Sequence, residues 1–175
     1  TCAVLYGRLA CWGRGNRGQL GLGNLDTVGK DEVPVDYSPG NGADNFVDFS
    51  HASLGTTTVQ MACAGSQFTC ALMLSGNVTC FGRDSNGQLG QPGTFTAPAP
   101  QPIALPESEG SRAAQSIACG QAHACALMSG GDVSCWGENG DGQLGYPTAT
   151  ELTEPGELVS LPTVDGSNKV KSVHA

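Results

Sequence analysis

The chain has 175 residues, including 26 glycines, 10 prolines and 8 cysteines, and carries a formal net charge of −8 at pH 7. Its hydrophobic fraction of 39% excludes a disordered chain, and no apolar run approaches the roughly 18 residues of a membrane-spanning helix. The 8 lysine and arginine residues are scattered, which argues against a nucleic-acid partner because binding to phosphates needs clustered basic residues.

An eleven-residue segment occurs three times, at 11–21, 80–90 and 135–145. Each copy begins with cysteine, an aromatic residue and glycine, and ends with Gly-Gln-Leu-Gly. The second copy follows the first after 69 residues, and the third follows the second after 55. A repeat of this length is typical of propeller blades with variable outer loops, so we interpret residues 1–175 as one propeller segment.

The first repeat, about 1–58, contains only the later part of the pattern, with short β-rich runs at 1–5 and 9–11. In the second repeat, about 59–113, runs at 69–72 and 77–81 flank a Ser-Gly-Asn turn. In the third, about 114–168, equivalent runs flank Gly-Gly-Asp. Glycine and asparagine accept positive φ, so these sequences predict β-hairpins. No stretch shows sustained helical periodicity, and we therefore expect an all-β fold.

Two further stretches precede the hairpins, Met-Ala-Cys-Ala-Gly at 61–65 and Ile-Ala-Cys-Gly at 117–120. Together with the hairpins and the eleven-residue segments, they resemble the repeats of the regulator of chromosome condensation superfamily over roughly two thirds of the chain. The resemblance implies β-propeller blades of four strands, usually seven to a ring. The chain supplies three repeat-lengths, so we expect a partial propeller, or one that is completed by oligomerisation.

Each repeat places an aromatic side chain and a leucine at fixed positions. We expect the aromatic residues to fill the core between neighbouring blades, because they occupy one repeat position. The leucines belong to the Gly-Gln-Leu-Gly turns, and we expect them to be buried. These repeat-core residues are Trp12, Phe81, Trp136, Leu20, Leu89 and Leu144.

Six of the eight cysteines lie symmetrically about the hairpin turns, at facing positions that suit disulfide geometry. The predicted bridges are Cys2–Cys11, Cys70–Cys80 and Cys125–Cys135. Free buried thiols and zinc ligation are the alternatives, although spacings of nine and ten differ from the Cys-x-x-Cys pattern of zinc sites. Cys63 and Cys119 share one repeat position in this reading, and either bridge adjacent blades or stay free. Disulfides predict an extracellular or cell-surface protein.

Two features suggest covalently attached glycans. Asn77-Val78-Thr79 is an N-glycosylation sequon at a predicted turn. The Ala-Pro run at 96–102 reads as an extended edge or linker segment. It also resembles the Ala-Pro modules of plant and algal wall glycoproteins, which implies Pro98 and Pro100 as modification sites.

The candidate chemistry is sparse. The glycine pattern at 13–18 matches a dinucleotide fingerprint but lacks the following helix, and the acidic turns at 84–87 and 138–142 lack the closing glutamate of a calcium loop. His123 lies near Cys125 without a third orienting group, and His51 and His174 have no evident partner. We therefore expect no enzyme activity, no cofactor and no metal.

The ends of the chain stop at nearly the same point of the repeat. The tail at 169–175 repeats the start of the third repeat, so that Ala175 corresponds to Cys119 and Thr1 to Ala124. The chain has no initiator Met and no signal peptide, which suggests a processed or partial chain. We expect the tail to pair with the strand at 2–5 of another copy, or of a continuation of the same polypeptide, because unpaired strand edges associate.

These observations favour an extracellular, non-catalytic structural or protein-interaction module that forms part of a repetitive surface or filament assembly. The expected partners are other copies or further repeats of the same chain. Two alternatives follow from the resemblance. One is a guanine-nucleotide exchange factor for a small GTPase, and the other is a secreted protein inhibitor that acts through one propeller face.

Overall fold

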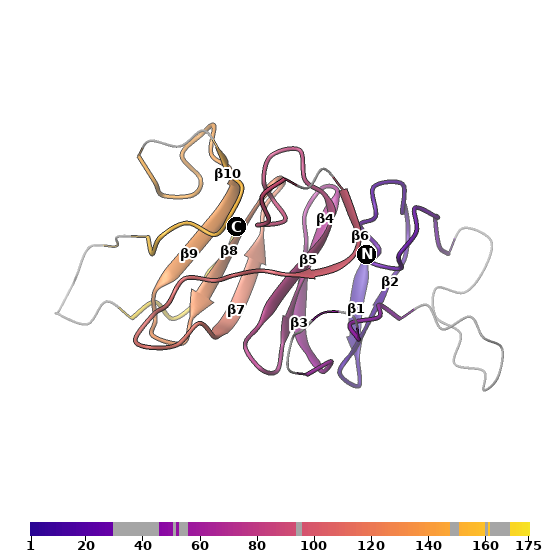
Figure 1. Ribbon diagram of the computed structural model, residues 1–175, viewed down its shortest axis with the longest axis horizontal. Coiled ribbons are helices and arrows are strands. Elements are labelled where there is room, and N and C mark those ends of the chain that lie inside the picture. Colours follow the sequence, from indigo (N-terminus) through magenta and orange to yellow (C-terminus); the bar gives the residue numbers. More distant parts are fainter. Residues whose placement is uncertain are drawn as a thin grey trace.

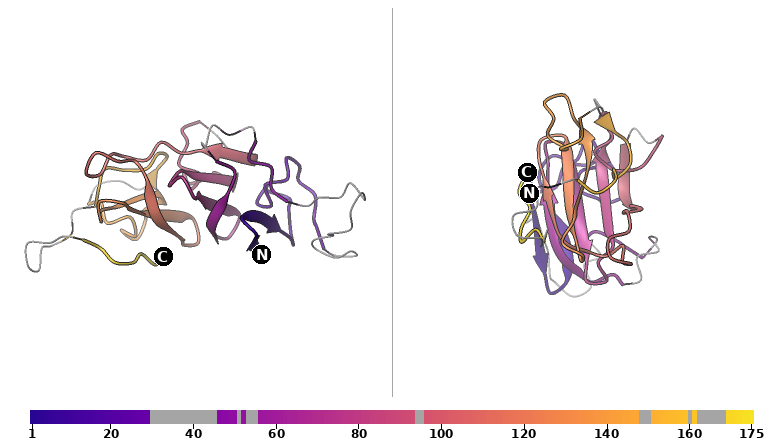
Figure 2. Two further views of the ribbon diagram at one scale, coloured as in Figure 1. Left: turned by 90° about the horizontal axis from the view of Figure 1, so that it is seen from below. Right: turned by 90° about the vertical axis from the view of Figure 1, so that its left-hand side faces the viewer.

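The structure is a computed structural model, and it describes residues 1–29, 46–50, 52, 56–93, 96–147, 151–159, 161 and 169–175. Its strands form three antiparallel sheets that lie in a row in chain order (Figures 1 and 2). We call these sheets blades 1 to 3. The part of the chain that is described contains no helix with the length and apolar character needed to cross a membrane.

Blade 1 contains β1 (Cys2–Leu5) and β2 (Arg8–Cys11), and an isolated bridge joins Ala10 to Phe46. Blade 2 has the order β3 (Val59–Ala64), β4 (Phe68–Met73), β5 (Val78–Arg83) and β6 (Thr96–Pro102). Blade 3 repeats this order with β7 (Ala114–Cys119), β8 (His123–Met128), β9 (Val133–Glu138) and β10 (Glu151–Leu152). The hairpins that the sequence predicts are therefore present in all three blades.

Blades 2 and 3 match residue by residue with an offset of 55. The pair Cys70↔Cys80 in blade 2 corresponds to Cys125↔Cys135 in blade 3. The irregularity between Val59 and Met61 in β3 recurs between Ala114 and Ser116 in β7. The strand register thus gives an alignment of the two repeats that does not depend on sequence similarity.

The cores lie between the blades, because the central strands are covered on both faces. All six residues of β4 are buried. Phe68, Cys70 and Leu72 belong to the cluster shared with blade 3, whereas Ala71 and Met73 belong to the cluster shared with blade 1. Successive side chains of a strand point to opposite faces, so each blade contributes one face to each of two neighbouring cores.

The Ala-Pro run forms β6, the outer edge of blade 2. The carbonyl of Pro98 accepts a hydrogen bond from the Gly23 N–H (2.9 Å), and the Pro102 carbonyl accepts one from the Gln91 side chain (2.8 Å). Both carbonyl groups thus point away from β5. The pairing of β6 with β5 shifts register between Ala97 and Gln101, where Pro100 lies. Proline has no N–H, so this edge lacks donors at alternate residues and is a poor template for another strand.

This placement bears on the expectation that Pro98 and Pro100 carry glycans, which stays a prediction. Pro100 is buried and Pro98 is half-buried. A Cβ atom on Gly18 of blade 1 would lie 2.6 Å from the Pro98 Cα. Pro100 is thus covered in the folded blade, and the run forms an edge strand.

Candidate interaction site: the contact between blades

The Gly-Gln-Leu-Gly turn has the same two internal hydrogen bonds in blades 2 and 3. Blade 1 shares one of them, from the Arg17 N–H to the Gln19 side-chain oxygen (2.8 Å), because Gly15 stands where the other blades have Asp84 and Asn139. In blade 2, the Gln88 side-chain oxygen accepts the Asn86 N–H (2.8 Å), and Asp84 accepts the Leu89 N–H (2.8 Å). Equivalent bonds join Gln143 to Asp141 and Asn139 to Leu144 in blade 3. These bonds give the turn the same conformation in both blades.

The leucine of each turn is buried, with Leu20, Leu89 and Leu144 exposed by 3%, 0% and 1%. They anchor the turns to the blade cores. The final glycine of the turn has positive φ and lies directly against the aromatic residue of the following blade. A Cβ on Gly90 would come within 3.0 Å of the Trp136 indole nitrogen, and one on Gly21 within 2.7 Å of the Phe81 ring. Glycine is needed here because a larger residue would separate the blades.

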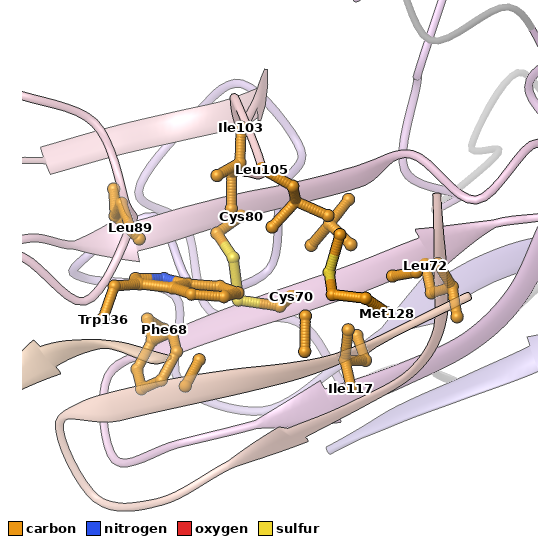
Figure 3. Packing of buried hydrophobic residues seen from close by; sticks show 14 of the residues in the cluster. Phe68, Cys70, Leu72, Cys80, Leu89, Ile103, Leu105, Ile117, Met128 and Trp136 are labelled. Carbon is orange, nitrogen blue, oxygen red and sulfur yellow. A yellow bond between two sulfur atoms is a disulfide. The ribbon is translucent and has the colours of Figure 1, made fainter. Parts of the chain in front are cut away.

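Trp136 joins blade 3 to the turn of blade 2. It is fully buried, and its indole N–H donates to the Gln88 carbonyl at 3.1 Å. Figure 3 shows the ring between Leu89 and Phe68, directed toward the Cys70–Cys80 disulfide. Trp136 thus contributes both buried aromatic surface and a hydrogen bond to the contact between blades 2 and 3.

Phe81 occupies the same place between blades 1 and 2 but has no N–H to donate. There the Thr69 hydroxyl donates to the Gln19 carbonyl at 2.9 Å. Blade 3 has Ala124 at the position equivalent to Thr69. The two contacts therefore satisfy the same turn carbonyl in different ways, with Phe81 and Thr69 in one and with Trp136 and Ala124 in the other.

Trp12 departs from the expectation of a buried core aromatic. It is only half-buried, whereas Phe81 and Trp136 are fully buried. The reason is its position in blade 1, since no Gly-Gln-Leu-Gly turn covers it in the part of the chain that the structure describes. Trp12 instead packs beside the core shared by blades 1 and 2.

The structure joins six cysteines within the hairpins, as Cys2–Cys11, Cys70–Cys80 and Cys125–Cys135. In each pair the two residues lie directly opposite each other, with Cα atoms 4.1 Å apart. This is close to the shorter of the two spacings in an antiparallel ladder. The hairpins therefore bring these sulfur atoms together without bending either strand.

The fourth bridge, Cys63–Cys119, joins blade 2 to blade 3. The expectation that the two cysteines share one repeat position is wrong by one residue. Cys63 pairs with Cys70, but it is Ala118 that pairs with Cys125, and Cys119 pairs with Ala124. Adjacent strand positions point to opposite faces. Cys63 thus faces blade 3 and Cys119 faces blade 2, which brings the two sulfur atoms together.

The remaining candidates are scattered. Asn77 is exposed at its turn, while the Thr79 hydroxyl is buried and donates to the Gln101 carbonyl (2.7 Å). His174 is exposed, and His51 lies outside the described residues. The glycine pattern at 13–18 forms part of a turn, and no group of three or more metal-ligating side chains occurs among the residues that the structure describes.

Two titratable groups are shifted by burial. Burial lowers the pKa of His123, and the nearby Glu138 carboxylate partly opposes this shift. Burial raises the pKa of Tyr146, whose hydroxyl contacts the Cys135 N–H and the Glu157 carbonyl and so ties the outer loop of blade 3 to β9. Sequence reasoning missed Tyr146, since it has no counterpart in the other repeats.

Comparison with known proteins identifies the repeats. The family model described as "Regulator of chromosome condensation (RCC1) repeat" matches residues 6–72 and 75–127. A second model with the same description matches 59–88 and 114–143, which are again 55 residues apart.

Among the similar proteins, the RCC1 domain-containing protein RUG3, mitochondrial, of Arabidopsis thaliana is 34% identical over 156 residues, which cover 89% of this chain and 32% of that protein. The ultraviolet-B receptor UVR8 of the same plant is 29% identical over 91% of this chain and 44% of its own length. The chain therefore spans less than half the length of these relatives.

A solved structure, that of yeast RCC1 (Prp20) bound by Kap60, superposes with a TM-score of 0.67. The alignment covers 97% of this chain and 36% of that one, at 22% sequence identity. At this identity the likeness establishes the fold, and the three sheets are blades of a β-propeller.

Proposed function

Because the chain belongs to the regulator of chromosome condensation (RCC1) repeat family, we propose that it is a non-catalytic protein-interaction module whose partners are other blades of the same kind. These blades belong to further repeats of the same polypeptide or to other copies. The side chains that the repeats have in common support this role, since they pack one blade against the next.

The contact between blades is the observation that carries the proposal. It is asymmetric, with the aromatic residue of one blade beneath the turn of the preceding blade. A contact of this heterologous kind repeats along a row and generates rings or filaments. Trp12 of blade 1 is the half-buried member of the aromatic series, so this blade presents a face suited to another Gly-Gln-Leu-Gly turn.

The strand edges support the same partner. β1 pairs with β2 alone among the described strands, whereas β4 and β8 have strands on both sides. At the other end, the Val170 N–H donates to the Gly131 carbonyl at 2.9 Å. The N–H groups of Val59 and Ala114 make equivalent bonds where β3 and β7 begin. The segment 170–175 thus corresponds to the first strand of a blade, and none of the described strands takes that place beside β1.

The disulfides support a place outside the cytosol, where such bridges persist. Peptide mapping of native material without reductant tests this part of the proposal. We expect the three hairpin bridges to be intact, and free thiols at two of them would contradict an extracellular role.

Sedimentation velocity of the 175-residue chain tests the interaction role. We expect concentration-dependent association that Trp12→Ser weakens. Tyr6→Ser is the matched control, because Tyr6 is fully exposed in a turn of the same blade. Association that both variants leave unchanged, or a chain that stays monomeric at every concentration, would contradict the proposal.

A further inference from the structure

The bridge between blades 2 and 3 differs in exposure from the bridges within the hairpins. Cys63 and Cys119 are both half-buried. Cys70 and Cys80 are fully buried, and Cys125 and Cys135 are exposed by 5% and 4%. In the remaining bridge, Cys11 is fully buried and only Cys2 is partly exposed. Cys63–Cys119 is therefore the one bridge of the four in which both cysteines are half-buried rather than buried.

We propose that Cys63–Cys119 is a thiol–disulfide exchange site for dithiol reductants, and that it opens while the three hairpin bridges stay closed. One thiolate of the dithiol attacks the Sγ of Cys63 or Cys119, and the other cysteine leaves as a thiolate and takes up a proton. The second thiol of the reductant then displaces the bound cysteine. Two protein thiols form, and the dithiol becomes a disulfide, so that two electrons and two protons are transferred.

The position of the bridge in the fold explains its access. β3 and β7 are the edge strands of their sheets, whereas the hairpin bridges of blades 2 and 3 join central strands. Cys70–Cys80 lies in the core beside Trp136 and Phe68 (Figure 3). An attacking thiolate needs direct access to a sulfur atom, and the core denies that access unless the blades separate.

The contact between the blades does not depend on the bridge alone. The core around Trp136 remains after exchange, and two backbone hydrogen bonds between the blades flank the bridge. The Ser66 N–H donates to the Gln121 carbonyl (3.0 Å), and the Ala114 N–H donates to the Gly76 carbonyl (2.8 Å). Exchange therefore yields a folded protein whose blades 2 and 3 are joined by the main chain between β6 and β7 and by non-covalent contacts.

Limited reduction with dithiothreitol under native conditions tests the proposal. Samples are alkylated at intervals with iodoacetamide, and the cysteines are mapped by mass spectrometry. We expect Cys63 and Cys119 to be labelled together, at least about ten times faster than the six hairpin cysteines, because the latter need a larger opening of the structure. Equal labelling of all eight cysteines, faster labelling of a hairpin pair, or no labelling short of unfolding would overturn the proposal.

A double variant separates local exchange from unfolding. Cys63→Ser with Cys119→Ser should remove the fast phase and leave the slow labelling of the other cysteines within about twofold. Ala64→Ser, a change at the blade 2 position equivalent to Cys119, is the matched control and should keep the fast phase. Hydrogen exchange of the wild-type protein should become faster in β3 and β7 on reduction, while the hairpin strands stay protected. A fast phase that survives in the double variant would assign the reactivity to another bridge.

Discussion

The glutamine carbonyl of the Gly-Gln-Leu-Gly turn accepts a hydrogen bond from an indole at one contact between blades and from a threonine hydroxyl at the other. Mutation can exchange these two donors. Trp136→Phe with Ala124→Thr converts the contact of blade 3 into the one that Phe81 and Thr69 make in blade 2. In that contact the threonine hydroxyl, rather than the indole N–H, donates to the turn carbonyl. We expect the two substitutions to compensate each other.

The magnitudes follow from the burial of the site. Trp136→Phe alone leaves the Gln88 carbonyl without its indole donor in a fully buried place, which costs about 1–3 kcal/mol. Ala124→Thr alone places a hydroxyl and a methyl group against the intact indole, an overpacking of about 1–3 kcal/mol. In the double variant the hydroxyl fills the vacated space and donates to the carbonyl. The coupling between the two substitutions should therefore be favourable by about 2 kcal/mol.

Urea unfolding of the four proteins, with all disulfides intact, measures this coupling. In thermal unfolding of the same proteins, the double variant should melt roughly 4–8 °C higher than the sum of the single effects predicts, since 1 kcal/mol shifts the melting temperature by about 2–4 °C at this chain length. The reverse exchange, Phe81→Trp with Thr69→Ala, is the control at the other contact. Additive effects in both double variants would refute the reasoning, because the hydroxyl and the indole would then not serve the same carbonyl.

Three further predictions concern single positions. Because burial lowers the pKa of His123, the unfolded chain binds the proton more tightly, and the free energy of unfolding should fall as the pH drops through about 6.5. His123→Phe, which copies Phe68 at the equivalent position, should flatten this dependence in urea titrations at pH 5 to 8. Asn77 is exposed, so secretion from eukaryotic cells should add a glycan that Asn77→Gln abolishes, and an unmodified Asn77 peptide would count against the sequon. Gly82 has a φ of 119°, and its Cβ would lie 2.5 Å from the Gln67 carbonyl oxygen, so Gly82→Ala should cost at least about 2 kcal/mol in the same assay.

The sequence predicts the hairpins and the pairing within them because both depend on local spacing. Cysteines at equal distances from a glycine turn must face each other once the hairpin forms. The all-β fold and the family follow in the same way, since the eleven-residue segment recurs with its turn chemistry intact. These features need no knowledge of how the blades pack.

The contacts between blades are less accessible to sequence reasoning, because they depend on which face a side chain occupies. A shift of one residue along a strand reverses that face. Cys63 lies two residues before Gly65, but Cys119 lies one residue before Gly120, and the two glycines are equivalent in the fold. An alignment of the repeats on these two glycines places Cys63 and Cys119 at adjacent strand positions, and so on surfaces that face each other. An alignment on the two cysteines instead gives them the same position and removes this difference.

The partial exposure of Trp12 has a different cause. Its position in the repeat is the same as that of Trp136, and what differs is the neighbouring blade. A residue's repeat position determines its role only when both of its neighbours are present. No property of the segment around Trp12 could have revealed this.

The bridge between Cys63 and Cys119 also determines how the chain responds to tension. Its two ends are 56 residues apart in sequence but 5.5 Å apart between Cα atoms. A force applied to the termini is carried across this bond and bypasses the intervening segment. That segment would otherwise extend by about 155 Å at roughly 3.4 Å per residue, since the Cys70–Cys80 bridge already withholds ten of its residues. About a quarter of the contour length is thereby withheld from stretching, and its release depends on thiol chemistry rather than on the force itself.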